Sequence, residues 1–214
     1  MLEREIIDII KNTTGERSLS DFLSRNPNII RWAVCRTGGH KNYVIKEFPF
    51  GSKYKADYVV PTSYSGVWEV NLIELEPHDD QVITKNGVPS NRLNKAISQI
   101  NDWKEYIEHN PLQFRNDLAQ WCIKKDILGF SNDGKIPTNF TGDLLNSPDT
   151  FIRYNYFIAI GNRENISIEK RRKMNQLSKE IEIFTYGRFV DLARKFDNIQ
   201  RDPTATENLR DFDD

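Results

Sequence analysis

Three carboxylates of this sequence stand in otherwise apolar runs and could bind a metal ion. Asp57 is followed by Tyr-Val-Val, and Glu74 and Glu76 alternate with apolar residues in Ile-Glu-Leu-Glu-Pro. An ionised carboxylate is costly to bury unless it is paired or coordinates a metal. Two such acids on neighbouring strands, with the Leu75 carbonyl as a further oxygen, would form an incomplete cage that suits Mg²⁺ or Mn²⁺ and leaves positions for water.

An ion held in this way indicates phosphodiester chemistry. It can polarise a phosphate, lower the pKa of a bound water and stabilise the leaving oxygen. Because side chains two apart on a strand share a face, Glu76 is expected beside Glu74. The spacing alone equally allows Asp57, Glu74 and Glu76 to lie at an exposed sheet edge without any ion, and this alternative stays open here.

Strands are predicted to carry these acids. The pattern indicates strands over 43–48, over 54–60 with Pro61 as its end, and over 68–76 with Pro77 as its end. The third run is apolar on both faces before its acidic end. That profile is typical of a strand in the middle of a sheet that is covered on both sides.

Helical periodicity surrounds the strands. A short amphipathic helix is predicted over 2–10, and a long helix with one apolar stripe starts at Ser90 or Asn91. The remaining predicted elements are helices over 112–128, 167–179 and 186–196, and strands over 154–160 and 181–185. The order predicts an α/β fold with a central mixed β-sheet flanked by helices.

The chain is predicted to form one domain over 1–200 with short N-terminal helices. The tail, 201–214, is acidic and almost without apolar residues, so disorder is expected there. The formal net charge is −1, and a polyanion therefore needs a local basic patch for binding.

Two cysteines, Cys35 and Cys122, stand far apart, and the three histidines have no partner at zinc-ligand spacing. No signal peptide or membrane span is visible, so a cytoplasmic location with free thiols is expected.

Several segments resemble the Shedu family of the PD-(D/E)xK nuclease superfamily, a family associated with bacterial defence against phage. The two strongest matches begin at Phe50 and Trp68 and contain the three acids. Further matches follow in the same order, and the resemblance extends from about Leu19 to Phe196. These further matches are Ala96-Ile-Ser-Gln-Ile-Asn-Asp-Trp, Ile158-Ala-Ile-Gly-Asn-Arg and Thr185-Tyr-Gly-Arg-Phe.

The resemblance implies a restriction-endonuclease-like core and a set of site residues. Asp57 and Glu74 match the two metal-binding acids of the family, and Gln99 matches a helical glutamine that faces the active site in related nucleases. Gly161 and Arg163 match a late-strand Gly-x-Arg feature to which no role is assigned.

Glu76 departs from the superfamily pattern, which has a lysine there to orient the attacking water and stabilise the transition state. Three replacements are considered. Lys55 shares the strand face of Asp57, Lys95 shares the helix face of Gln99, or Glu76 itself binds a second cation. Lys95 is favoured over Lys55.

The predicted function is a Mg²⁺- or Mn²⁺-dependent DNA endonuclease or nickase. Lys53, Lys85 and Arg92 are predicted to bind the DNA backbone around the site. The alternative is a catalytically inactive nuclease-fold protein that binds DNA or regulates, because Glu76 replaces the lysine. RNA as the substrate also stays open, and a homo-oligomer and a separate sensor protein are the further partners considered.

Overall fold

The computed structural model describes residues 1–35, 39–129, 134–177 and 179–201. The predicted disordered tail therefore lies outside the described residues from 202 onward. The helices are α1 (Leu2–Asn12), α2 (Arg17–Arg25), α3 (Pro27–Val34), α4 (Asn91–His109), α5 (Pro111–Lys125), the short η1 (Arg163–Asn165), α6 (Ile168–Leu177) and α7 (Gly187–Arg201). The strands are β1 (Lys41–Asn42), β2 (Ile45–Phe50), β3 (Tyr54–Tyr64), β4 (Val67–Leu75), β5 (Ile152–Ala159) and β6 (Glu182–Phe184).

The six strands found in the described residues form one mixed sheet. Its order is β1-β3-β4-β5-β6, and β2 pairs with β3 beside β1. The pairs up to β3–β4 are antiparallel, whereas β4–β5 and β5–β6 are parallel. This arrangement confirms the predicted α/β fold with a central mixed sheet and puts β3 and β4 in its interior.

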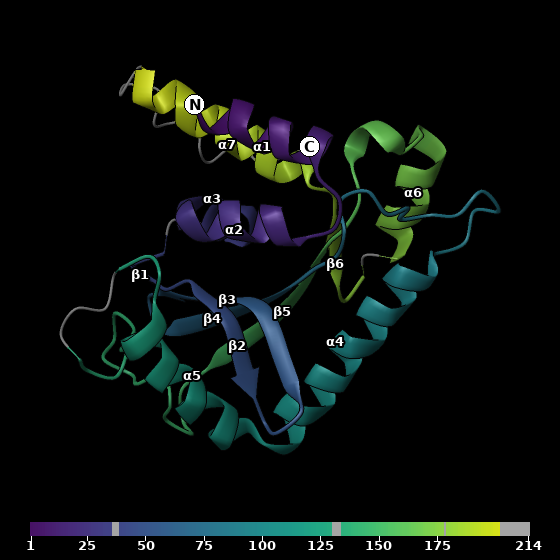
Figure 1. Ribbon diagram of the computed structural model, residues 1–214. Coiled ribbons are helices and arrows are strands. Elements are labelled where there is room, and N and C mark those ends of the chain that lie inside the picture. The colour runs from purple at the N-terminus through teal and green to yellow at the C-terminus, as the bar shows by residue number, and fades with distance from the viewer. Residues whose placement is uncertain (36–38, 130–133, 178, 202–214) are drawn as a thin grey trace.

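Helices cover both faces of the sheet, as Figure 1 shows. On one face, α4 and α5 pack on the strands through side chains such as Trp103 and Phe114. On the other face, α2 and α3 lie on the sheet, and α1 and α7 run side by side beyond them (Figure 1). Both cysteines are buried and free, in agreement with the sequence prediction.

The prediction that Pro61 ends a strand is wrong, because β3 continues to Tyr64. The nitrogen and carbonyl of one strand residue point to the same side, and the Pro61 carbonyl accepts a hydrogen bond from Tyr43 N at 3.0 Å. The missing N–H of Pro61 therefore faces the break between β1 and β2, where it interrupts no regular ladder.

The long helix α4 follows its predicted pattern. Ser90 caps it, since Ser90 Oγ accepts a hydrogen bond from Leu93 N at 3.1 Å. Its apolar stripe, which includes the fully buried Trp103, packs into the core. Across the described parts of the chain, no helix combines the length and apolar character needed to cross a membrane.

Candidate functional site

Asp57 and Glu74 lie on paired strands at the point where the β3–β4 ladder ends. The last rung joins Tyr58 to Ile73. Beyond it, Leu75 N donates a hydrogen bond to Asp57 Oδ2 at 2.7 Å, so a carboxylate takes the place of a strand carbonyl. The structure thus brings together the two acids that the sequence singled out.

The alternation of side chains shifts phase around Asp57. In β2, Glu47 lies between the residues that pair with Ala56 and Tyr58, and it has a positive φ of 51°. In β3, Ala56 packs into the core on the α4 side, whereas the next core residue, Tyr58, packs on the opposite side. Asp57 lies between these two faces, and its carboxylate turns along the sheet toward Leu75.

Glu74, on β4, and Glu76, one residue beyond it, both contact α4, so the two side chains lie on the same side of the sheet. Gln99 donates a hydrogen bond to the Glu74 carboxylate. Arg92 Nε lies 3.2 Å from Glu76 Oε2, and only 7% of Glu76 is exposed. The alternative of an exposed sheet edge is therefore wrong, because β3 and β4 are interior strands and Glu76 is buried.

Burial raises the pKa of all three carboxyl groups and is the largest cause for each. The charges of Asp57 and Glu76 raise the pKa of Glu74 further, and the Leu75 N–H opposes the shift at Asp57. Burial raises the pKa of Glu76 to about 7 although Arg92 opposes it. The site is an accumulation of like charge that a bound cation would relieve.

The donor atoms fit a hard divalent cation. Carboxylate and carbonyl oxygens are the ligands that Mg²⁺ and Mn²⁺ prefer. Among residues 1–35, 39–129, 134–177 and 179–201, no three His, Cys, Asp or Glu side chains are grouped closely enough to hold a metal ion. An ion bound by Asp57, Glu74 and the Leu75 carbonyl would therefore depend on water for its other ligands.

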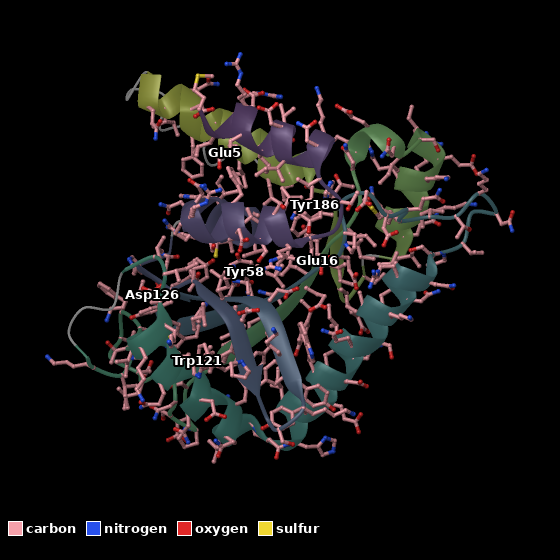
Figure 2. All side chains as sticks on the ribbon, in the orientation of Figure 1. Glu5, Glu16, Tyr58, Trp121, Asp126 and Tyr186 are labelled. Carbon is pink, nitrogen blue, oxygen red and sulfur yellow. The ribbon has the colours of Figure 1, made fainter. Side chains whose placement is uncertain are left out.

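Glu16 is a fourth acid of this region that sequence reasoning missed. It immediately precedes α2 and lies near the middle of the molecule in Figure 2. Its charge contributes to the raised pKa of Asp57, Glu74 and Glu76. Glu16 is far from the other acids in sequence, and its only signal was an acid between Gly15 and the start of a helix.

The buried His78 holds the loop that precedes Glu16. Its Nδ1 lies 2.7 Å from the Gly15 carbonyl oxygen, and its Nε2 lies 3.0 Å from that of Thr13. Gly15 N also donates to Asp79 Oδ1 at 2.9 Å. His78 and Asp79 therefore anchor this loop beside the end of β4.

The two candidate replacement lysines differ in position. Lys55 Nζ lies 3.0 Å from Glu47 Oε1. This hydrogen bond is the main cause that raises the pKa of Lys55, and the charges of Asp57 and Glu74 raise it as well. Lys95 is exposed on α4. The charge of Lys55 thus reaches both acids from their own sheet, and a catalytic role for either lysine stays a prediction.

The three predicted DNA-binding residues lie in two places. Lys53 is in the β2–β3 turn, where its Nζ lies 5.4 Å from the centre of the Tyr54 ring. Gly51, two residues before Lys53, packs against Tyr106 in the C-terminal part of α4. Arg92 is in the first turn of α4, and Lys85 lies in the loop before it. DNA binding by these residues stays a prediction, and any contacts at Lys53 would be separate from those at Arg92.

The Gly-x-Arg feature has a structural explanation. Gly161 has a φ of 70°, and a Cβ there would lie 2.9 Å from the Asp80 carbonyl oxygen. Gly161 N donates to Pro77 O at 3.1 Å, which ties the loop after β4 to the end of β5. Arg163 forms an ion pair with Asp191 of α7 at 2.7 Å.

Comparison with curated proteins gave no match. A family model described as "Shedu protein SduA, C-terminal" matches residues 13–190. The matched range contains β3, β4 and α4 and therefore the acids Glu16, Asp57, Glu74 and Glu76. Because the match covers most of the sequence, the chain belongs to the Shedu SduA C-terminal family.

Proposed function

We propose that this chain is a divalent-cation-dependent DNA endonuclease or nickase with a restriction-endonuclease-like core, acting in bacterial defence against phage. Membership of the Shedu family supports the role in defence. The observation that carries the proposed activity is the pair of half-buried acids, Asp57 and Glu74, on adjacent strands with raised pKa values. Such a pair is costly without a cation, and pKa values perturbed in this way cluster at functional sites.

In this proposal Asp57, Glu74 and the Leu75 carbonyl hold Mg²⁺ or Mn²⁺. When bound, the ion would act as a Lewis acid toward the phosphodiester and would lower the pKa of a water that it binds. The protein supplies orientation: Leu75 N–H holds the Asp57 carboxylate, and the Gln99 amide holds that of Glu74. Glu76 adds negative charge that strengthens the attraction for a cation.

A second candidate function is a nuclease-fold protein that binds DNA or regulates without cutting. Glu76 favours it, because a glutamate cannot supply the positive charge of the lysine that the superfamily pattern has at this position. The two candidates make opposite predictions about cleavage and the same prediction about DNA binding.

Plasmid nicking separates these functions. Purified protein is incubated with supercoiled plasmid in Mg²⁺ or Mn²⁺, with single-stranded RNA as a parallel substrate. We expect nicking of the plasmid that is lost in Asp57→Asn and Glu74→Gln. Glu69→Gln is the matched control, since Glu69 is also on β4 but pairs with Arg153 at the other end of the strand.

Three outcomes would count against the nuclease proposal. Nicking that persists in Asp57→Asn and Glu74→Gln would show that another site or a contaminant cuts. DNA binding without cleavage in either metal would favour the second candidate. Cleavage of RNA alone would replace the proposed substrate.

A further inference from the structure

Arg92 occupies the region in which the PD-(D/E)xK superfamily pattern has a lysine. Glu76 lies one residue beyond β4, and its backbone N donates to Ala159 O at 2.8 Å, so its position is held by the sheet. Arg92 approaches it from the first turn of α4, with Nε 3.2 Å from Glu76 Oε2. A positive charge therefore stands at this point after all, and it comes from the helix instead of the strand.

Arg92 lies in line with the rest of the site. It is seven residues before Gln99, so two helical turns separate residues on one side of α4. The two acids that they contact, Glu76 and Glu74, are two residues apart and lie on the same side of the sheet. The helix and the strand thus form two side-chain pairs, Gln99 with Glu74 and Arg92 with Glu76. The second pair lies just beyond the end of β4.

The guanidinium of Arg92 is held at one end and accessible. A second carboxylate, Asp80 Oδ2, also lies 3.2 Å from Nε. Half of the Arg92 side chain is exposed. A guanidinium presents five N–H donors in a planar fork, so one that is held at Nε can still bind two oxygens of a phosphate.

We propose that Arg92 is the cationic catalytic residue of this site: its guanidinium binds the attacked phosphate of the nucleic acid and replaces the missing lysine. This inference rests on the proposed function. In hydrolysis a water oxygen bonds to phosphorus and the bond to the leaving oxygen breaks, while one water proton passes to the leaving oxygen and the other to solvent. Arg92 keeps its own proton throughout, because a guanidinium does not lose it at working pH, and it stabilises the charge that develops on the phosphate oxygens.

The test compares Arg92→Gln and Arg92→Lys with Arg153→Gln. Arg153 is a close match, since it is also a half-exposed arginine paired with a glutamate, in this case Glu69 at the other end of β4. Single-turnover nicking is measured with Mn²⁺, and DNA affinity is measured by fluorescence anisotropy with Ca²⁺ over a series of salt concentrations. We expect Arg92→Gln to slow nicking by about 10²-fold or more, as removal of a donor to a developing negative charge does. Arg92→Lys should recover part of the rate, and Arg153→Gln should behave like the parent.

DNA affinity gives a readout that a purely structural role would not change. Loss of one phosphate contact lowers the slope of log K against log salt by about 1 in magnitude. We expect this change in Arg92→Gln and not in Arg153→Gln, with both variants folded by circular dichroism.

The outcomes separate this inference from the proposed function. If the parent cuts and Arg92→Gln cuts equally fast, the inference is wrong and the nuclease proposal stands. If both Arg92 variants are slow but keep the salt slope of the parent, Arg92 only braces Glu76, and the inference is again wrong. If the parent binds DNA without cutting, the nuclease proposal fails. In that case an unchanged salt slope in Arg92→Gln would also show that Arg92 does not contact a phosphate.

Discussion

Both ends of β4 carry polar or acidic side chains, but the neighbours of these side chains differ between the two ends. Near its start, Glu69 forms an ion pair with Arg153 at 2.7 Å and accepts a hydrogen bond from Tyr64 Oη at 3.1 Å. Two residues on, the buried Asn71 donates to Val60 O at 3.1 Å and accepts from Asn155 at 2.9 Å. Each of these polar groups has a complementary partner.

At the other end of the strand, acids face acids. Glu74 has Asp57 and Glu76 as charged neighbours, and their charges raise its pKa. The hydrogen bond from Gln99 opposes this rise but does not cancel it. Burial alone therefore does not identify a functional acid. An acid buried with a matching partner stabilises the fold, whereas acids buried together lower stability and need a ligand to offset the cost.

The largest expected effect is opposite behaviour of two glutamates on the same strand. Glu74→Gln should slow plasmid nicking by about 10³-fold or more if the acid binds the metal. The same substitution should raise the free energy of unfolding by about 1 kcal/mol, because it removes repulsion between neighbouring carboxylates. Glu69→Gln should leave nicking unchanged and lower stability slightly. Nicking assays and urea unfolding test this, and a destabilised Glu74→Gln would contradict the comparison.

Metal binding should stabilise the folded protein only when the acidic end of β4 is intact. Mn²⁺ at about 100 times its Kd raises the free energy of unfolding by about 2.7 kcal/mol if it binds the folded chain alone. Differential scanning fluorimetry should therefore show a Tm that rises with Mn²⁺ in the parent and in Asn71→Ala. The same titration should leave the Tm of Glu74→Gln nearly constant, and an equal rise in all three proteins would place the metal elsewhere.

Removal of a hydrogen-bonded side chain near the start of β4 should lower the free energy of unfolding. Asn71→Ala leaves the Val60 carbonyl and the Asn155 amide without their partner inside the protein, a loss of about 1–3 kcal/mol. Urea unfolding measures this loss. The DNA affinity of the folded variant should equal that of the parent, and weaker binding would mean that the two ends of β4 are coupled.

The smallest expected effect is the pH dependence of the metal-free protein. The folded-state pKa values of Asp57, Glu74 and Glu76 are raised, so the folded chain keeps protons that the unfolded chain has lost. The free energy of unfolding should therefore fall as the pH rises from about 4, the ordinary carboxyl range, through about 7, the pKa of Glu76. Urea unfolding in EDTA at a series of pH values checks this. The decline should be shallower in Glu74→Gln, and a stability that rises over this interval would contradict the acidic cluster.

Much of the fold follows from local patterns. The apolar residues on both faces of β4 predicted an interior strand, and the two-residue period of a strand predicted that Glu74 and Glu76 share a face. The helical period of α4 and the capping residue Ser90 were likewise readable. By contrast, the prediction that Pro61 ends a strand failed. Pro61 is accommodated by the break between β1 and β2, and this break belongs to the neighbouring strands and cannot be seen in the sequence around Pro61.

The sequence by itself determined which residues are acidic, how they alternate along their strands and which helix stripe is apolar, because these are short-range periodicities. Only the tertiary structure decided that Glu16 adds its charge to the same site, that Lys55 is electrostatically coupled to both acids, and that Arg92 pairs with Glu76. The physical reason is that distances across loops depend on how whole elements pack. A helix of 19 residues can place any of its turns against a strand end, and only the packed core selects which one.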